Sequence, residues 1–219
     1  MRRCILCRKH DQHLEHISYD WEIDHSNYRE IWQAESPEAL KLIARADALG
    51  EAGAGDAIEL LQEAAECGSI IAHYKLGWHH WTGTGTKENL PAALEHYRSA
   101  FAGGLSMASL HFARLSNIMG QSEEAERVYL RGVDAGFLPA NYWLAEHRYN
   151  LLPTRKTAAL IRPLLEPAAR AEHPHARILE ARLHLLGKYG LRSIFRGIQL
   201  TLETYRDLAP TSEQLERYS

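Results

Sequence analysis

The sequence is poor in the residues that build large β-sheets, disulfide frameworks and membrane spans. Valine occurs only twice, at Val128 and Val133, whereas alanine and leucine together supply about a quarter of the 219 residues. Strands favour β-branched residues and helices favour Ala, Leu, Glu and Arg, so this composition predicts an all-α chain. Three cysteines are too few for a disulfide framework. No apolar run approaches the roughly 20 residues that cross a bilayer, so no membrane span is expected.

Neither sign of charge is in clear excess. The chain has 25 basic and 28 acidic residues and a net charge of -3, whereas nucleic-acid-binding proteins usually carry a clustered basic excess. Charged residues from Arg8 to Asp11 interrupt the apolar N-terminal stretch that a secretory signal needs. These features predict a cytoplasmic protein that binds no nucleic acid, no membrane and no small-molecule substrate. The sequence gives no indication of the oligomeric state.

Small residues recur along the chain at nearly constant intervals. The segment that begins at Ala57 aligns with the one that begins at Ala93 after a shift of 36 residues, and further shifts of 32 and 36 residues continue the pattern. In the fourth copy Glu172 stands where the earlier copies have glycine. A period of about 35 residues is typical of stacked helical repeats. The matched positions are Ala57/Ala93/Ala125, Ala64/Ala100/Gly132/Ala168, Gly68/Gly104/Gly136/Glu172, Ala72/Ala108/Ala140/Ala176 and Gly77/Ala113/Ala145/Ala181.

Each repeat is expected to be a hairpin of two antiparallel helices, helix A followed by helix B. Small residues occupy the positions where the two helices cross closely, because a larger side chain would hold the backbones apart. Gly68, Gly104 and Gly136 follow the B helices, where a left-handed residue ends a helix and reverses the chain. One hairpin cannot bury its apolar face alone. The sequence therefore predicts a right-handed α-solenoid of about five hairpins, at residues 37–68, 69–104, 105–136, 137–172 and 173–207.

The start of the first hairpin and the whole of the fourth carry further local signals. Ser36, followed by Pro37 and Glu38, is a strong helix start, with serine as the cap and proline in the first turn. In the fourth hairpin Pro163 and Pro167, together with Pro153, are expected to interrupt and kink the second helix, because proline lacks the N–H that a helix needs.

The second hairpin carries the pattern of a known repeat. Residues 72–77 read AHYKLG, the inner turn contains Gly83 and Gly85, and Ala93, Tyr97, Ala100 and Gly104 follow. This pattern resembles the Sel-one-like repeat (SLR) family, a branch of the tetratricopeptide-related superfamily, and the resemblance covers roughly residues 37–207. His80 and His96 replace the usual tyrosine and tryptophan of that family. The resemblance implies a solenoid that holds other proteins, as such repeats do in bacterial regulators, adaptors and inhibitors of toxins or enzymes.

The N-terminal region contains a cluster of potential zinc ligands. Cys4 and Cys7 form a C-x-x-C pair, and His10, His13 and His16 follow at three-residue intervals. Thiolates and imidazoles are good zinc ligands, and four of these residues would complete a site. However, a three-residue step drifts around a helix by about 60°, so all five cannot converge, and a second loop-separated ligand pair is missing. We therefore expect no cofactor, with zinc held by Cys4, Cys7, His10 and His13 as the alternative.

Three further patterns have simpler explanations than catalysis. Cys4 and Cys7 followed by Glu22–His25 resemble the opening of an HNH-type nuclease, but repeats replace the second half of that module. The Gly83–Lys87 turn lacks the strand and the spacing of a Walker loop. His80, at a core position of the repeat, is expected to be packed with its ring hydrogen-bonded; alternatively, the 13 histidines make the array sensitive to pH or to metal. No nucleophile has a recognisable base, so no enzymatic activity is expected.

A partner is expected to bind in the concave groove, which the A helices line in the related tetratricopeptide geometry. The A-helix positions that are not used for A/B packing carry Tyr, Trp, Met and Arg, which are enriched at protein contacts. The alternative is that several of these aromatic residues belong to the core between neighbouring repeats. The predicted groove residues are Ile71, Tyr74, Trp78, Trp81, Met107, Leu110, Arg114, Asn117, Tyr142, Glu146, Tyr149, Ile178, Arg182 and Leu185.

Three regions are predicted. Residues 1–36 form an N-terminal extension with the Cys/His cluster, residues 37–207 form the repeat array, and residues 208–219 form a polar C-terminal tail. The extension contains an apolar stripe that is expected to form a short helix covering the exposed end of the array. Alternatively, this segment docks a partner. The stripe consists of Trp21, Ile23, Tyr28, Ile31 and Trp32.

The expected function is a non-enzymatic scaffold or adaptor that binds a protein partner. One alternative is an inhibitor or immunity-type protein that blocks a partner enzyme or toxin, which a cognate toxin encoded next to it would indicate. The other is a zinc-binding or metal-dependent enzyme module at the N-terminal Cys/His cluster. A stoichiometric metal that is lost in Cys4→Ser and Cys7→Ser variants would favour this last alternative.

Overall fold

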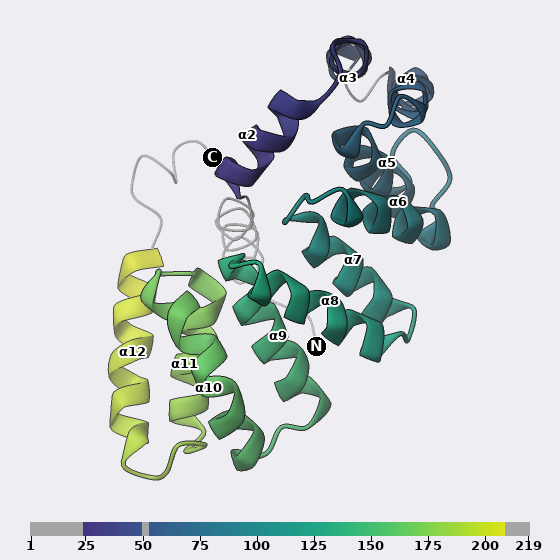
Figure 1. Cartoon of the computed structure of the whole chain (residues 1–219). Helices are drawn as coiled ribbons and strands as arrows, with labels where there is room; N and C mark the ends of the chain where they lie inside the picture. The colour runs from purple at the N-terminus through teal and green to yellow at the C-terminus, as the bar shows by residue number, and fades with distance from the viewer. Residues whose placement is uncertain (1–23, 50–52, 209–219) are drawn as a thin grey trace. The chain divides into compact units, whose positions relative to one another are not determined.

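The computed structural model describes residues 24–49 and 53–208, which form eleven α-helices and no strand (Figure 1). The chain divides into two compact units, Asp24–Phe137 and the residues from Leu138 onward. The first unit contains α2 (His25–Ala34) and three helix pairs, and the second contains two helix pairs. The all-α prediction is confirmed, and each of the five predicted hairpins contains one pair of helices.

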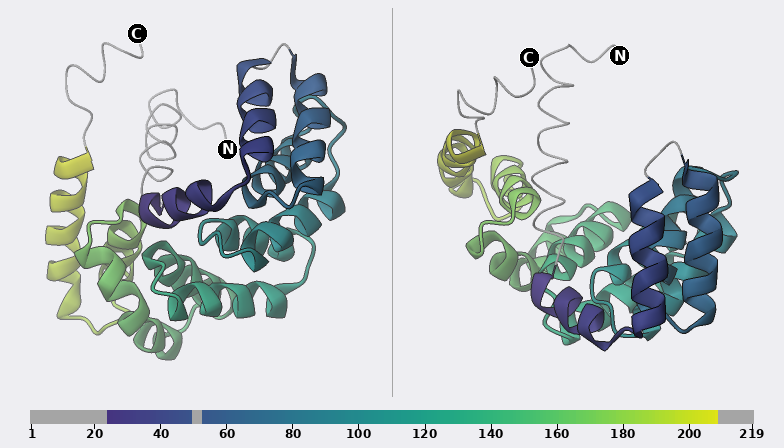
Figure 2. Two further views of the ribbon diagram at one scale, coloured as in Figure 1. Left: turned by 45° about the horizontal axis from the view of Figure 1, so that its top comes forward. Right: turned by 90° about the horizontal axis from the view of Figure 1, so that it is seen from above.

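The helices of each pair run antiparallel, as Figure 2 shows, and consecutive helices pack against each other from α3 to α8 and from α9 to α12. The pairs of the first unit are α3 (Pro37–Leu49) with α4 (Ala54–Glu66), α5 (Ile70–Thr82) with α6 (Leu90–Ala102), and α7 (Ala108–Ile118) with α8 (Ser122–Asp134). The pairs of the second unit are α9 (Leu138–Leu151) with α10 (Arg155–Arg170), and α11 (Pro174–Leu185) with α12 (Ser193–Leu208).

Short polar side chains begin several of these helices. The hydroxyl of Ser36 accepts a hydrogen bond from the N–H of Ala39 at 3.1 Å, which confirms the predicted start of the first hairpin. Ser69 caps α5 in the same way, with its oxygen 3.0 Å from the nitrogen of Ala72. Asn89 and Thr154 cap α6 and α10. Each cap satisfies an N–H group that has no partner within its helix.

The small residues lie where the helices cross, as the repeat pattern predicts. A Cβ atom added to Gly77 of α5 would lie 2.8 Å from the ring of Tyr97 in α6. Ala72, Ala93 and Ala100 are completely buried. The two helices can approach closely only because these side chains are small, so the tyrosine ring fills the space that they leave.

The B helices end at residues with left-handed backbone conformation. Gly68, Gly104 and Gly136 have φ angles of 84°, 95° and 76°. At the same position in the fourth hairpin Glu172 has a φ of 64°, and it is the only non-glycine residue with positive φ in the described part of the chain. The turn geometry is therefore kept in the fourth repeat although the glycine is not.

The inner turn of the second hairpin packs against the first hairpin. Gly83 ends α5 in the left-handed conformation, with a φ of 73°. Gly85 has a φ of 74°, and a Cβ atom added there would lie 2.5 Å from the carbonyl carbon of Ala54 at the start of α4. The G-x-G pair of this turn thus serves chain reversal and close contact between neighbouring repeats.

Helix α2 lies across the starts of the second and third hairpins. The side-chain amide of Asn27 donates to the carbonyl of Gly104 at 3.0 Å, and its oxygen accepts from the N–H of Ser106 at 2.8 Å. Glu35 accepts from the N–H of Ile71 at 3.0 Å. On the apolar side, Tyr28, Ile31 and Trp32 pack against the core of the first two hairpins. The other residues of the predicted stripe, Trp21 and Ile23, lie outside the described residues.

Two prolines lie inside α10, which runs without interruption over Arg155–Arg170. The prediction that prolines interrupt this helix is therefore wrong. Pro163 and Pro167 are exposed, and so is Ala159, one turn before them. Because these residues lie on the exposed side of the helix, water can replace the hydrogen bonds that the prolines cannot donate. The buried side of α10 keeps Ala158, Ile161 and Leu165 in the core of the second unit.

Candidate interaction surface

Five of the fourteen predicted groove residues are buried in their own units. These residues cannot contact a partner through an exposed face, so this part of the groove prediction is corrected. Ile71 belongs to the core formed with the preceding hairpin, and Tyr142 and Tyr149 belong to the core of the second unit. The reason is that each A helix also packs against a neighbouring hairpin of its unit: α5 and α7 contact the hairpin before them, and Tyr142 and Tyr149 of α9 pack with α10 and α11. The five buried residues are Ile71, Met107, Leu110, Tyr142 and Tyr149.

Five other predicted residues of the first unit are partly or fully exposed, and they lie on the A helices α5 and α7. Three are aromatic and follow one face of α5, and two are polar and lie on α7. Trp78 is the most exposed, at 44%. We call this set the α5–α7 surface; it consists of Tyr74, Trp78, Trp81, Arg114 and Asn117.

An aromatic cluster joins the helices beneath this surface. The hydroxyl of Tyr74 in α5 lies 2.9 Å from Nε2 of His111 in α7, which makes a hydrogen bond between the two A helices. The His111 ring stacks on the ring of Tyr97 at 5.1 Å, with an angle of 18° between the planes. Trp81 meets both of these rings edge-on, at 5.7 and 6.0 Å. Such edge and stacked contacts fix the orientation of the rings, so the exposed aromatic residues stand on a rigid base.

His111 is neutral in this cluster. Burial lowers its pKa to about 3, and the nearby Arg114 guanidinium adds to the effect. Its Nδ1 atom is enclosed and has no hydrogen-bond partner among the described residues. A neutral imidazole can therefore act as a flat packing element and as a hydrogen-bond partner of Tyr74, but not as a cation at neutral pH.

Three further histidines lie together on the other side of the second hairpin. Nδ1 of His73 lies 3.0 Å from Nδ1 of His96, and the ring of His80 stacks on that of His96 at 5.4 Å. Burial lowers the pKa of His96 to about 4, and the pKa values of His73 and His80 are lowered mainly for the same reason. Nδ1 of His80 has no partner among the described residues, so at this nitrogen the expected hydrogen bond is absent.

The remaining predicted residues lie in the second unit. Glu146 of α9 and Ile178 of α11 are half-buried, whereas Arg182 and Leu185 of α11 are exposed. An aromatic cluster lies near the start of α11, where the ring of Tyr142 is 5.1 Å from His173 and 5.7 Å from His175. Burial lowers the pKa of His173 to about 4, and its Nδ1 accepts from the N–H of Ala176 at 3.4 Å. His173 therefore caps α11 as a neutral ring.

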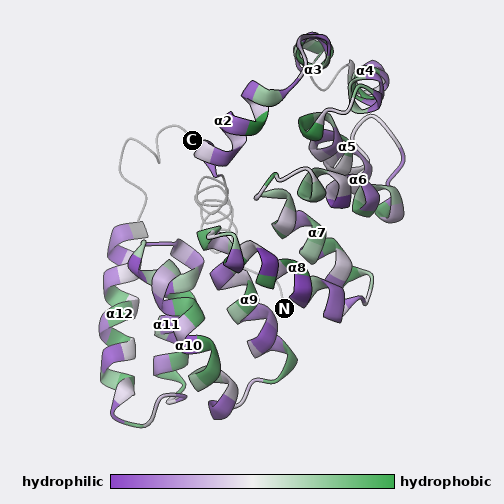
Figure 3. Cartoon of the chain, viewed as in Figure 1, coloured by the Kyte–Doolittle hydropathy of each residue, from purple (hydrophilic) through white to green (hydrophobic). Residues whose placement is uncertain are grey.

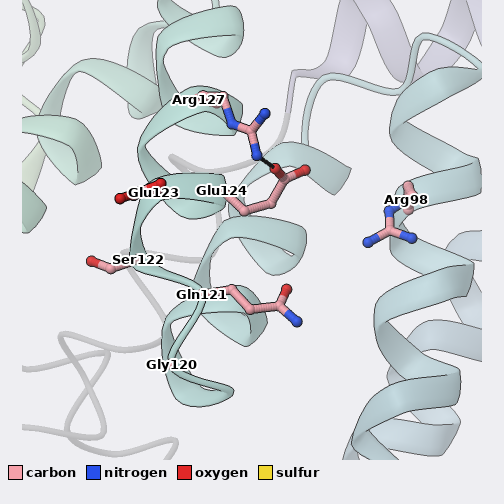
Figure 4. A pocket seen from close by; sticks show the side chains of 7 residues that line it. All are labelled: Arg98, Gly120, Gln121, Ser122, Glu123, Glu124 and Arg127. Atoms are coloured by element: carbon pink, nitrogen blue, oxygen red, sulfur yellow. Dashed lines mark hydrogen bonds and ion pairs between the residues drawn. The ribbon is translucent and has the colours of Figure 1, made fainter.

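Two surface hollows lie in the first unit, and neither contains a predicted residue. One, of about 540 Å³, lies between α6 and the start of α8 (Figure 4). Its arginines are already engaged, since Arg127 pairs with Glu124 and Arg98 lies 2.6 Å from Glu95. The second hollow, of about 650 Å³, lies between α3 and α4 and includes Asp56, Glu59 and Glu63.

The residues described by the structure contain no group of three or more His, Cys, Asp or Glu residues that could hold a metal ion. The predicted zinc ligands Cys4, Cys7, His10 and His13 lie outside those residues. Over the same ranges, no helix has the length and hydropathy of a membrane span.

His111 is the central residue that the sequence analysis did not select. It lies one turn after Met107 and three residues before Arg114, on the helix face from which both were chosen. Helical spacing alone would therefore have selected it. Its hydrogen bond to Tyr74 could not be foreseen, because it joins residues 37 positions apart.

Residues 55–69 and 70–105 match the Sel1 repeat family. This part of the chain carries Sel1 repeats. The fold of the chain is similar to that of a Sel1 repeat protein from Oxalobacter formigenes, with a TM-score of 0.58, 19% identity, and 70% of this chain and 65% of that chain covered. It is also similar to a protective antigen of uropathogenic Escherichia coli strains that displays an SLR fold, with a TM-score of 0.56, 18% identity, and 67% of this chain covered.

The chain spans 65% of the first SLR structure and 33% of the second. At such low identities these similarities establish the fold and not the partner. No curated protein matches the chain in sequence. The resemblance to Sel-one-like repeats that the sequence shows is confirmed over residues 55–105.

Proposed function

We propose that this SLR protein is a non-catalytic scaffold that binds a protein partner through the α5–α7 surface. The observation that carries the proposal is the ring cluster of Tyr74, Trp81, Tyr97 and His111, which links three helices beneath the surface. Rigid, partly exposed aromatic side chains give large contact area at a low cost in conformational entropy. The exposed indole of Trp78 extends from the same helix face of α5.

The partner that fits this surface presents an apolar side chain together with polar groups. The indoles of Trp78 and Trp81 on α5 supply the apolar contact, and Arg114 and Asn117, which are partly exposed on α7, supply polar side chains. Tyr, Trp and Arg are the residue types that most often carry binding energy at protein interfaces. We therefore assign the role of anchor to Trp78 and a supporting role to Arg114.

The test is quantitative affinity capture of partners from the native host with the wild-type chain and with Trp78→Ala and Arg114→Ala variants. We expect the main partner to be reduced at least tenfold by Trp78→Ala, since loss of an anchor costs about 2 kcal/mol. Leu160→Ala is the matched control, because Leu160 is 67% exposed on α10, in the other unit. A partner that is retained equally by all variants would exclude the α5–α7 surface.

A further inference from the structure

Three histidines of the second hairpin form a cluster that the proposed protein-binding surface does not use. His73 and His80 lie two turns apart on α5, and His96 lies on α6. Hydrophilic positions occur among the hydrophobic ones along both helices (Figure 3). All three histidines are half-buried, so packing holds their rings while solvent still reaches them. Imidazole is a common metal ligand, and this cluster is therefore a place to look for a metal site.

The rings of His73 and His96 have the spacing of two ligands of one ion. Their Nδ1 atoms lie 3.0 Å apart, and their ring centroids lie 5.3 Å apart with an angle of 40° between the planes. Two nitrogen ligands at about 2.0–2.1 Å from a zinc ion are about 2.9 Å apart at a right angle and about 3.3 Å apart at the tetrahedral angle. The observed separation falls between these values, so a small rotation of the rings lets both nitrogens face one ion.

The charged surroundings of the cluster favour a cation. Burial lowers the pKa of His73, and the carboxylate of Glu35 opposes this effect. The other two histidines of the cluster are affected by burial and by neighbouring histidines. In contrast, the charged neighbour of His111 is the Arg114 guanidinium. A carboxylate attracts a cation and a guanidinium repels it, so the cluster is a better metal site than the His111 ring.

The protonation of the rings is also compatible with a bound ion. Burial lowers the pKa of His96 to about 4, so protons compete little for its nitrogens at pH 7. In the hydrogen bond between His73 and His96 one Nδ1 donates and the other accepts. When both Nδ1 atoms bind an ion, the proton of the donating ring moves to its own Nε2. Both rings then remain neutral, and no net proton is released.

We propose that Nδ1 of His73 and Nδ1 of His96 bind one divalent transition-metal ion, with water as the remaining ligands. Imidazole suits Zn²⁺, Cu²⁺ and Ni²⁺. The ring of His80 stacks on that of His96 with only 3° between the planes, so it orients the His96 ring and is not a ligand. A site with two protein ligands exchanges its ion readily, and it agrees with the lack of any larger ligand group among the described residues.

The ion would join the two helices of the second hairpin, so its binding should stabilise the fold. Titration calorimetry with ZnCl₂ tests this on the full-length Cys4→Ser/Cys7→Ser chain, which lacks the N-terminal thiols. We expect one zinc ion per chain and a higher midpoint of thermal unfolding with zinc. His73→Gln or His96→Gln in the same background should weaken binding about tenfold or more and remove the shift. His25→Gln, exposed on α2, is the matched control and should change neither result.

Nuclear magnetic resonance of the imidazole nitrogens locates the ion in the chain that keeps both ligands. We expect zinc to shift the Nδ1 signals of His73 and His96 and to leave their Nε2 atoms protonated. Circular dichroism checks that the glutamine variants fold. Equal zinc affinity with and without the two histidines, no binding by the Cys4→Ser/Cys7→Ser chain, or unshifted Nδ1 signals would each overturn the proposal. The second of these results would assign any zinc of the wild type to the N-terminal cysteines.

Discussion

Gly77 and Tyr97 share one small volume at the crossing of α5 and α6. The position admits no Cβ atom without displacement of the ring, which also stacks on His111. Because Gly77 has no side chain, the Tyr97 ring fits into the repeat core and also stacks on His111 beneath the α5–α7 surface. At this scale the structure and the proposed function depend on the same residue.

Gly77→Ala is predicted to destabilise the protein by about 1–3 kcal/mol, because overpacking forces the Tyr97 ring or the helix to move. Urea unfolding followed by circular dichroism measures this change. Gly55→Ala is the matched control: its Cβ would meet only the carbonyl oxygen of Gly85, at 3.8 Å, and alanine is the better helix former. Equal effects of the two changes would contradict the close-crossing explanation.

Cys67 shows that the burial of a single side chain is not always predictable from its position in the sequence. Its place beside Gly68 at the end of the first hairpin suggests partial burial, yet in the structure it is an exposed free thiol. The side chain of a residue at a helix end is covered only when the next element turns over it, and sequence position does not specify this. We therefore expect Cys67 to react rapidly with Ellman's reagent in the native state, with slow reaction as the contrary result.

At the scale of helices, the fourth hairpin keeps a glycine-type turn without its glycine. Glu172 carries a positive φ of 64° where three earlier repeats have glycine. A left-handed residue with a side chain costs roughly 1 kcal/mol, so Glu172→Gly should stabilise the protein by about that amount. Thermal unfolding measures it, and Gly136→Ala, at the equivalent turn of the third hairpin, should show the opposite sign. A destabilised Glu172→Gly variant would contradict this account.

Helix positions were predictable from the repeat pattern, whereas exposure was not. Alanine and glycine recur where helices cross, and caps such as Ser36 lie next to the first turn, so both signals are local. Whether an A-helix residue faces a partner or the preceding hairpin depends on how two repeats stack. For this reason the sequence assigns Ile71 and Leu110 to the groove although they are buried, whereas Trp78, assigned by the same pattern, is exposed.

The prolines of α10 also show that tertiary packing can override a prediction made from the local sequence. Pro163 and Pro167 lack the N–H of a helix interior, so the sequence alone predicts an interruption. The helix persists because both prolines lie on the exposed side and the buried side still packs with Ile161 and Leu165. Tertiary contacts thus stabilise a helix that its own sequence disfavours.

At the scale of the whole molecule, several histidines are held neutral by burial. The pKa values of His96 and His173 are lowered to about 4, and that of His111 to about 3. In the unfolded chain each of them takes up a proton near its ordinary pKa of 6.5, so below that pH the unfolded state binds more protons than the folded state. Stability should therefore decrease as the pH falls from about 6.5 towards 4.

This acid sensitivity can be measured by urea unfolding at pH 7 and pH 5. His111 alone should contribute a loss on the order of 2 kcal/mol between these values, because it stays neutral in the folded state at pH 5 while the unfolded chain takes up a proton there. The His111→Gln variant should lose less stability over the same interval, even though it starts from a lower value at pH 7. Stability that is equal at pH 7 and pH 5 would contradict the neutral, buried state of these rings.

The central claim is that partners contact this SLR protein at the α5–α7 surface, and site-specific photo-crosslinking in the native host tests it most directly. A photoreactive phenylalanine analogue is placed at position 78, within the surface, or at position 160, exposed on α10. The account predicts a covalent adduct with one defined protein from position 78 and none from position 160. An adduct of the same protein from position 160, with none from position 78, would contradict it.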